Sequence, residues 1–291
     1  MIKPMLAYKV DKKPVDWSEN VYIQPKLDGV RCVIYLDENE EIRCFSRTGK
    51  EFFNLDHIKD SLHDFFKMES KFSANTDVIL DGELYNHDLR DDFEKIISLV
   101  RKKTPTTQDR LDAAELIEFH CYDYIETVMN QPYGYRASQL MDSDIYSSCV
   151  KYVDTNLILR MDDARVYHAR NLAAGYEGSI MRLDKPYEQK RSYNLQKFKD
   201  FHDTEATIIG YEEGKGKREG TLGKFFMMDD DQNEFGCPPG KGYNYKDLAD
   251  ILNNIHDYIG QRATFTYFER TQYGSYRHPM FKTIRNYEWY I

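Results

Sequence analysis

The sequence contains no run of apolar residues close to the ~20 that a membrane-spanning helix requires. Its first residues, with Asp11, Lys12 and Lys13 near the start, also lack the apolar core of a secretory signal peptide. We therefore expect an intracellular, cytoplasmic protein with no membrane partner.

Paired cysteines are absent as well. The five cysteines are scattered without any C-x-x-C pair, so the sequence predicts neither a disulfide framework nor a zinc site. We expect them to be buried free thiols. They are Cys32, Cys44, Cys121, Cys149 and Cys237.

The chain lacks an excess of positive charge. Its net charge is −9, which by itself opposes a nucleic-acid partner, because phosphate contacts need Lys and Arg. The charges are unevenly distributed, however. Residues 185–224 hold nine bases against seven acids, and residues 261–291 hold five against two. A locally positive face on an acidic protein is therefore compatible with the composition.

At 291 residues the chain is long enough for one large and one small domain. Apolar periodicity in the first two thirds predicts an α+β domain. A turn at 27–29 joins two short strand-like segments, 21–26 and 31–36, and reads as a hairpin-like loop. Further buried strands are expected at 78–80, 116–122 and 179–183, with helices near 134–142 and 160–174.

From Glu205 onward the pattern changes to short strands with one helix, which is typical of a small β-barrel of the OB type. We therefore predict domains at 1–202 and 203–291. The strands of the second are expected at 206–211, 222–228, 263–268 and 280–284, and the helix at 245–258.

Residues 26–31, with the sequence K-L-D-G-V-R, are the most informative segment. They place an amine at the end of a strand, with a glycine, an aspartate and an arginine in the same turn. A lysine amine can act as a nucleophile once desolvation or neighbouring cations lower its pKa. Taken alone, such a short motif is only suggestive, and a plain surface turn is the alternative.

This segment resembles the K-x-D-G-x-R nucleophile motif of the covalent nucleotidyltransferases, which include ATP-dependent DNA ligases and mRNA capping enzymes. Six further segments resemble motifs of that family in the family's order, and together they span residues 22 to 286. They are S-R-T-G at 46–49, L-D-G-E-L at 80–84, F-H-C-Y-D at 119–123, E-G-S-I-M-R at 177–182, L-Q-K-F-K at 195–199 and R-H-P-M-F-K-T-I-R at 277–285.

The resemblance implies a nucleotidyltransferase (adenylation) domain with antiparallel sheets and flanking helices, followed by the OB-fold barrel. It also implies roles for individual residues. Lys26, Lys197 and Lys199 would be catalytic, and Glu83 and Glu177 would hold a divalent metal, Mg²⁺ or Mn²⁺, or ribose hydroxyls. The full predicted cofactor-binding set is Gln24, Lys26, Arg31, Arg47, Glu83, Tyr122, Glu177, Arg182, Lys197, Lys199, Arg277 and Arg285.

Within that set, Tyr122 would stack on adenine, and Arg31 and Arg47 would contact phosphate or ribose. Arg182 stands where many members of the family have Lys. Each residue also has a structural explanation: Glu83 and Glu177 as solvated acids, Tyr122 as a core aromatic, and the two lysines of K-x-K as one face of an edge strand. The ordered conjunction of the motifs favours the family.

The expected activity is ATP-dependent sealing of nicked duplex DNA by a monomer, through a lysyl-AMP intermediate. NAD-dependent ligases carry an N-terminal nicotinamide-binding region and a four-cysteine zinc module. Only 25 residues precede Lys26 and the sequence has no such set of cysteines, so we expect ATP rather than NAD as the cofactor. An mRNA guanylyltransferase or an RNA ligase is the runner-up, and a catalytically idle nucleic-acid-binding protein is a third reading. Small size suggests a viral source, and hence the host cytoplasm.

A Gly-rich loop carries three basic residues that either contact DNA or form a solvated hairpin tip: Lys215, Lys217 and Arg218.

Overall fold

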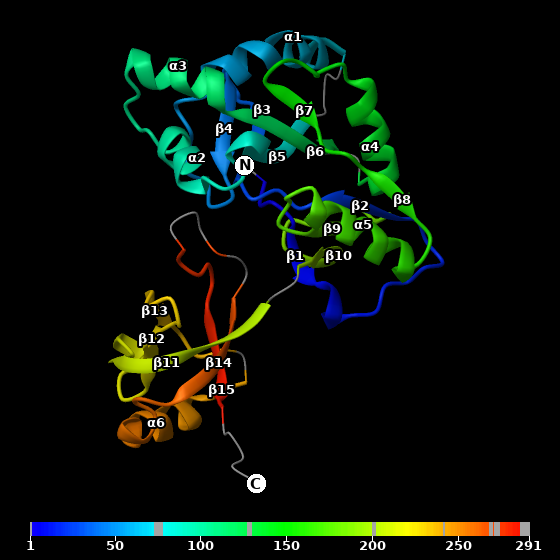
Figure 1. The fold of residues 1–291 in the computed structure, drawn as a ribbon. Coiled ribbons are helices and arrows are strands. Elements are labelled where there is room, and N and C mark those ends of the chain that lie inside the picture. The colour runs from blue at the N-terminus through cyan, green and yellow to red at the C-terminus, as the bar shows by residue number, and fades with distance from the viewer. Residues whose placement is uncertain are drawn as a thin grey trace. The chain divides into compact units, whose positions relative to one another are not determined.

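The computed structural model describes residues 2–72, 78–126, 130–199, 202–240, 242–267, 270 and 274–285. The chain divides into two compact units, residues 1–199 and 200–291. The first contains two five-stranded sheets and the second contains one (Figure 1). Within the described residues, no helix is both long enough and apolar enough to cross a membrane.

One sheet of the first unit carries most of its core. Its strand order is β4 (Ile42–Ser46), β3 (Val30–Leu36), β5 (Val78–Tyr85), β6 (Glu118–Glu126) and β7 (Val150–Tyr152), and only the β6–β7 pair is parallel. Leu55, Ile58 and Leu62 pack with Ile34 and Leu80 in one buried cluster, because residues three and four apart share a helix face. The accompanying helices are α1 (Asp56–Phe72), α2 (Phe93–Val100), α3 (Thr107–Leu116) and α4 (Tyr133–Asp142).

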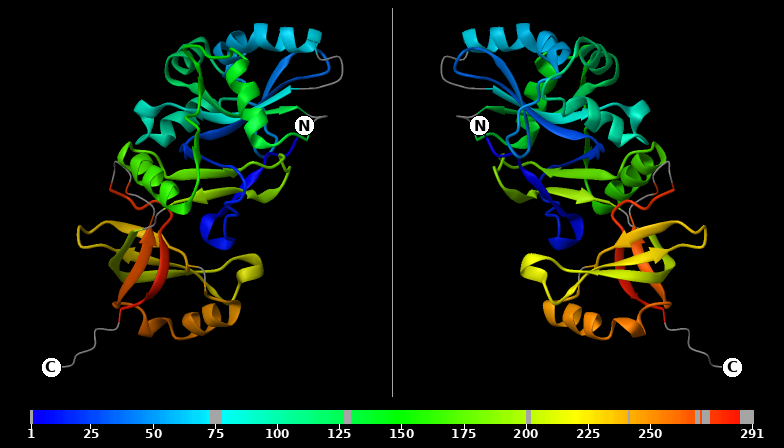
Figure 2. Two further views of the ribbon diagram at one scale, coloured as in Figure 1. Left: turned by 90° about the vertical axis from the view of Figure 1, so that its right-hand side faces the viewer. Right: turned by 90° about the vertical axis from the view of Figure 1, so that its left-hand side faces the viewer.

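The other sheet of the first unit brings the two ends of that unit together. Its order is β1 (Leu6–Lys9), β10 (Arg191–Phe198), β9 (Ser179–Leu183), β2 (Val21–Pro25) and β8 (Asn156–Ile158). The β1–β10 pair is parallel and the others are antiparallel. Helix α5 (Met161–Ala173) packs on β2, β8 and β9 (Figures 1 and 2). As a result, residues near the start of the chain lie beside residues near 195.

The segment between β2 and β3 corrects one prediction. The hairpin-like loop expected around residues 27–29 is wrong, because β2 and β3 do not pair and belong to different sheets. The chain instead crosses from one sheet to the other between Pro25 and Val30, so Lys26 lies at the junction of the two sheets. Gly29 allows this crossing: a Cβ atom there would lie 2.3 Å from the carbonyl oxygen of Leu84.

The second unit is an antiparallel sheet with one α-helix among its described residues. The strand order is β13 (Glu234–Cys237), β12 (Leu222–Met228), β11 (His202–Glu213), β14 (Arg262–Tyr267) and β15 (Met280–Ile284). Helix α6 (Tyr245–Asn253) starts with a capping box formed by Asn244 and Asp247. It is shorter than the predicted 245–258, because a 3₁₀ turn at Ile255–Asp257 follows it.

Within the described part of this unit, the sheet does not pair continuously into a closed barrel. Its two edges meet at a single parallel bridge between Pro239 and Phe281. There the Gly240 N–H donates to the Phe281 carbonyl, and the Phe281 N–H donates to the Pro238 carbonyl, both at 2.9 Å. The buried side chains inside the sheet include Phe225, Phe265 and Phe281. The unit is therefore OB-like, with the closure reduced to one bridge.

The cysteines agree with the sequence analysis. All five are free, four of them are buried, and Cys149 is partly buried.

Candidate active site

Lys26 and Glu177 are joined by main-chain hydrogen bonds. The Lys26 N–H donates to the Gly178 carbonyl at 2.9 Å, and the Glu177 N–H donates to the Lys26 carbonyl at 3.1 Å. The Glu177 carboxylate, 7% exposed, accepts hydrogen bonds from the amines of both Lys26 and Lys199. Burial alone would raise the pKa of Glu177, but the two lysines outweigh it and hold that pKa below its usual range. One carboxylate thus bridges two lysines, one directly after β2 and the other directly after β10.

The two lysines of K-x-K lie at the end of β10. Burial lowers the pKa of Lys197, and the nearby charges of Lys26 and Lys199 lower it further. Burial also lowers the pKa of Lys199, although Glu177 opposes this shift. Lys26 therefore lies in a cluster of cations around a single carboxylate, an arrangement suited to receiving a more highly charged anion.

Helix α5 supports the turn that carries Glu177. Gly178 has a φ of +146°, and a Cβ atom there would lie 2.4 Å from the Phe198 carbonyl oxygen. The buried ring of His168 stacks on Phe198, with centroids 4.0 Å apart and planes at 5°. Its Nδ1 contacts Ser179 Oγ at 3.2 Å, and Asn171 also donates to that oxygen, at 2.8 Å. His168 therefore links α5 to Ser179, which lies two residues after Glu177, and to Phe198, which directly precedes Lys199.

Glu83 lies on β5, opposite Arg31 of β3. Burial raises the pKa of Glu83 to about 7, although the charges of Lys26 and Arg31 oppose the shift. The hydroxyl of Tyr122 donates to Glu83 at 3.4 Å. Near neutral pH this carboxyl group is consequently divided between its acid and its carboxylate form.

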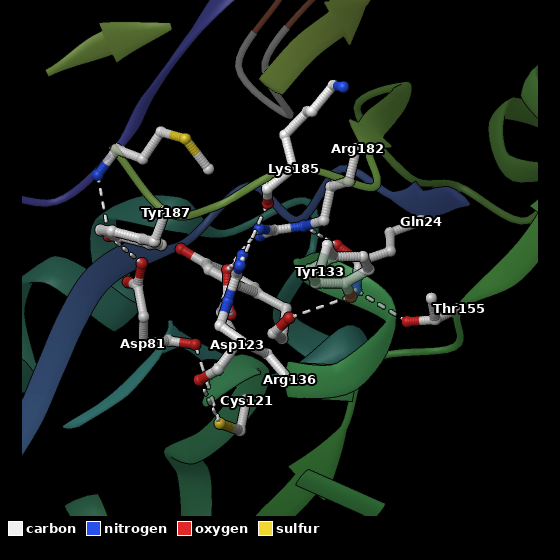
Figure 3. Close-up of polar contacts among 12 residues, drawn as sticks. Gln24, Asp81, Cys121, Asp123, Tyr133, Arg136, Thr155, Arg182, Lys185 and Tyr187 are labelled. Carbon is white, nitrogen blue, oxygen red and sulfur yellow. Dashed lines mark hydrogen bonds and ion pairs between the residues drawn. The ribbon is translucent and has the colours of Figure 1, made fainter. Parts of the chain in front are cut away.

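Arg31 is held in place by Asp81. Arg31 Nε donates to Asp81 Oδ1 at 2.8 Å, a second nitrogen contacts the other carboxylate oxygen, and Nη1 donates to the Met5 carbonyl at 2.9 Å. The Tyr187 hydroxyl also donates to Asp81, at 2.7 Å (Figure 3). Asp81 is fully buried and lies within the third motif, yet sequence reasoning did not select it. A charged residue in an apolar strand was the signal that could have identified it.

Arg182 and Gln24 lie deep in the first unit. Arg182 Nη1 donates to Asp123 at 2.8 Å, and its Nε donates to Gln24 at 2.6 Å. Gln24 in turn donates to the hydroxyls of Tyr133 and Thr155, at 2.9 and 2.7 Å (Figure 3). Both predicted residues therefore have protein partners here, and their contact with a cofactor stays a prediction.

Asp123 accepts hydrogen bonds from a second buried arginine that sequence reasoning missed. Arg136 Nε donates to Asp123 Oδ1 at 2.7 Å, and its Nη2 donates to Oδ2 at 3.1 Å (Figure 3). The Asp123 carboxylate therefore lies between two guanidinium groups, those of Arg136 and Arg182. Such a fully hydrogen-bonded buried group fixes the geometry around it.

The ring of Tyr122 is flanked by cations. The guanidinium carbon of Arg182 lies 4.9 Å from the ring centroid, and that of Arg31 lies 5.4 Å from it. The tyrosine is half-buried beside Glu83. Its stacking on adenine stays a prediction.

The remaining predicted residues lie elsewhere. Arg47 is exposed in the turn after β4. Arg277 and Arg285 belong to the second unit, where Arg285 forms an ion pair with Glu205. The residues of the predicted DNA-contacting loop are all exposed between β11 and β12, around the 3₁₀ turn Gly216–Arg218: Lys215, Lys217 and Arg218.

Comparison with known proteins gives two family matches and a set of viral relatives. Residues 4–199 match the ATP dependent DNA ligase domain, and residues 213–285 match the DNA ligase OB-like domain. A DNA ligase of Enterobacteria phage T6 is 25% identical in an alignment of 307 positions, gaps included, that covers 88% of this chain and 62% of that protein. A DNA ligase of African swine fever virus (isolate Tick/South Africa/Pretoriuskop Pr4/1996) is 30% identical over 236 residues, which cover 76% of this chain and 52% of that protein.

This chain therefore spans only about half to three-fifths of the length of those relatives. A solved structure from work on DNA binding by Lig E DNA ligases with a minimal scaffold has the same fold, with a TM-score of 0.77 at 21% identity, and the match covers 98% of this chain and 100% of that one. Because the match to the ATP dependent DNA ligase domain includes well over half of the sequence, the chain belongs to the ATP-dependent DNA ligase family.

Proposed function

We propose that the protein seals nicks in duplex DNA with ATP, and that Lys26 carries AMP as a covalent intermediate. The observation that supports this most strongly is the position of Lys26. Its amine lies beside Glu177 and in the same cluster of cations as Lys197 and Lys199.

In the first step the lone pair of Lys26 Nζ attacks the α-phosphorus of ATP. A nitrogen–phosphorus bond forms, the bond from that phosphorus to the bridging oxygen breaks, and its electron pair leaves with pyrophosphate. Lys26 gives up a proton in this step, and the contacting Glu177 oxygen is an acceptor within reach. Lys197 and Lys199 stabilise the charge that develops on the phosphates.

In the second step an oxygen of the DNA 5′-phosphate attacks the AMP phosphorus and displaces Lys26. In the third, the 3′-hydroxyl attacks the 5′-phosphate and expels AMP, which leaves a phosphodiester bond. The names of the relatives favour DNA over RNA as the substrate.

A divalent ion, Mg²⁺ or Mn²⁺, is part of the proposal. No group of three or more potential ligands gathers in the part of the chain that the structure describes, so an all-protein metal cage is not the expected arrangement. The carboxylate of Glu177 lies close enough to Glu83 for its negative charge to contribute to the raised pKa of Glu83. Mg²⁺ is commonly held by one or two carboxylates together with substrate phosphates, which fits this pair. The ion would polarise the phosphoryl oxygens.

The proposal extends to a monomer, because every motif residue is supplied by this one chain. A cytoplasmic location stays a prediction.

A labelling experiment tests the proposal. The protein is incubated with ATP or GTP labelled at the α-phosphate, denatured, and examined for a covalent label. We expect an AMP adduct on the wild type and none on Lys26→Ala. The variant should still seal a nick that already carries AMP, because only the third step then remains and that step does not use the amine. A GMP adduct would instead indicate a capping enzyme, and no adduct on the wild type would refute the proposal.

A further inference from the structure

Four residues of the first unit close a ring of hydrogen bonds beside the predicted nucleotide site. Arg31 contacts the Asp81 carboxylate through two nitrogens, and its Nη1 donates to the Met5 carbonyl at 2.9 Å. The Met5 N–H donates to the Tyr187 hydroxyl at 2.8 Å, and that hydroxyl lies 2.7 Å from Asp81 Oδ2. Each member of this ring, which we call the Arg31 ring, therefore contacts two others.

The Arg31 ring connects parts of the chain that are far apart in the sequence. Arg31 lies on β3 and Asp81 lies on β5, and both strands belong to one sheet. Met5 directly precedes β1, and Tyr187 lies in the connection between β9 and β10, which are strands of the other sheet. The ring thus ties the sheet that carries Arg31 to the sheet in which β10 ends at the K-x-K lysines.

The direction of the Tyr187 hydroxyl follows from its neighbours. The Met5 N–H can only donate, so it uses a lone pair of the hydroxyl oxygen. The single hydroxyl proton is then directed at Asp81, whose ionised carboxylate can only accept (Figure 3). Burial raises the pKa of Tyr187, and the negative charge of Asp81 raises it further, so the hydroxyl keeps this proton near neutral pH.

The orientation of Arg31 depends on this arrangement. Its predicted contact is with phosphate or ribose, and a guanidinium binds such groups through a rigid, directional fork. Asp81 holds one edge of the guanidinium, and the Met5 carbonyl holds Nη1. Met5 is buried, and its N–H has the Tyr187 hydroxyl as its partner. Loss of the hydroxyl would leave a buried N–H unsatisfied, so the main chain that holds Nη1 would move.

We infer that Tyr187 is a positioning residue for adenylation, because its hydroxyl holds the guanidinium of Arg31 in place through Asp81 and the main chain of Met5. The inference rests on the proposed function and adds a residue that lies outside every segment that resembles a family motif. Tyr187 acts through Arg31 and not by contact with the nucleotide.

The first test is the full chain with Tyr187→Phe, which removes one oxygen and keeps the ring. Its adenylation rate at saturating ATP should fall by about tenfold, because a small displacement of a group that contacts the substrate slows the reaction. The matched control is Tyr152→Phe. It removes another partly buried hydroxyl that accepts a main-chain N–H, that of Ile145 at 3.1 Å, and it should keep the wild-type rate. Thermal unfolding verifies that both variants are folded at the assay temperature.

The second test observes Arg31 directly in the protein without nucleotide. Its Nε–H donates to a buried carboxylate, so it should exchange slowly with solvent and give its own signal in a ¹H–¹⁵N spectrum. The signal is assigned by its absence from Arg31→Lys. We expect the exchange to be faster by about tenfold in Tyr187→Phe, because the ring opens more often, and to be unchanged in Tyr152→Phe.

Slower adenylation together with faster Nε–H exchange, in Tyr187→Phe but not in the control, supports the inference. A wild-type adenylation rate in Tyr187→Phe would overturn it. So would slow adenylation with unchanged exchange, because Tyr187 would then act on a group other than Arg31. A wild type without a slowly exchanging Arg31 signal would contradict the ring itself. If the wild type formed no AMP adduct, the proposed function would fail, while the exchange rates would still report on the ring.

Discussion

Glu83 changes its protonation state near neutral pH. Burial raises its pKa to about 7, so the carboxylate that would hold a metal forms mainly above that pH. We predict that adenylation at saturating ATP and Mg²⁺ accelerates between pH 6 and pH 8. Glu83→Gln should flatten this rise and reduce the rate by about 10- to 100-fold at pH 8. Single-turnover labelling across the pH range measures both, and parallel profiles for the two proteins would contradict the assignment.

Stability provides an independent check on the same residue. A carboxyl group whose pKa is raised by folding binds more protons in the folded state than in the unfolded state. Its stabilising contribution is complete below about pH 4.5 and is lost as pH rises through about 7. Glu83→Gln should therefore raise the unfolding temperature of the nucleotide-free protein more at pH 8 than at pH 5. An equal change at both pH values would argue against a shifted pKa.

Many residues of the site could be identified from sequence, because their motifs are local. The buried partners that form hydrogen bonds and ion pairs with them could not be identified in this way. Asp81 pairs with Arg31 across 50 residues, and Asp123 accepts from Arg182 across 59. Strand register determines which residues lie opposite each other, and it cannot be read from any single segment of the sequence. Sequence also gave no reason to separate His168 from the other histidines, since its importance lies in what it contacts.

At the scale of elements, α5 determines where Glu177 sits. We predict that His168→Ala slows adenylation by about tenfold with little change in the ATP concentration needed, because the turn at Gly178 loses its support while the nucleotide contacts remain. His168→Phe keeps the ring that stacks on Phe198 and should recover most of the rate. The test is to measure the adenylation rate of both variants, with thermal unfolding as a control for correct folding. If both variants lost only stability, His168 would be purely structural.

The connection between β11 and β12 supports a second prediction at this scale. Lys215 pairs with Glu212 at 3.4 Å, and Lys217 and Arg218 are exposed as well. Changing Lys215, Lys217 and Arg218 together to Ala should weaken nick binding and flatten its salt dependence. Lys215→Ala alone should change little, because Glu212 already offsets it. Adenylation should be unaffected, and a wild-type salt slope in the triple variant would show that the loop does not touch DNA.

The strands at 179–183, 222–228 and 280–284 have the bounds predicted from their apolar runs. The strand predicted at 78–80 is longer, Val78–Tyr85, because Asp81 interrupts the apolar run but is neutralised by Arg31. Strands such as β1 and β13 were not predicted. They are four residues each, and pairing with a neighbour rather than their own pattern makes them strands.

For the whole molecule, the two units are predicted to be separable. Each buried core cluster among the described residues lies within one unit, so a chain that ends after Asp203 should fold. Its adenylation should fall sharply, because Arg277 and Arg285 are removed. Its nick binding should also fall, because the rest of the second unit is lost with them. Circular dichroism confirms folding and labelling measures the adduct. Full nick sealing by the shortened chain would show that residues 204–291 have no part in the reaction.

The double variant Arg277→Ala/Arg285→Ala separates the arginines from the rest of the second unit. Arg285 pairs with Glu205 in this structure and would exchange that carboxylate for a phosphate. We therefore expect the double variant to lose adenylation while it retains most nick binding. Normal adenylation would place the pyrophosphate contacts elsewhere.

The parallel pairing of β1 with β10 has a consequence for synthesis in the cell. The partner of Leu6–Lys9 begins at Arg191, about 180 residues later in the chain. At about 5–20 residues per second, the first strand waits on the order of 10 to 40 s for its neighbour to be translated. During that interval Lys26 exists without Lys197 or Lys199. Each newly made molecule is thus unable to form its own active site until nearly the whole first unit has left the ribosome. We therefore expect Lys26 not to react with ATP while the chain is incomplete.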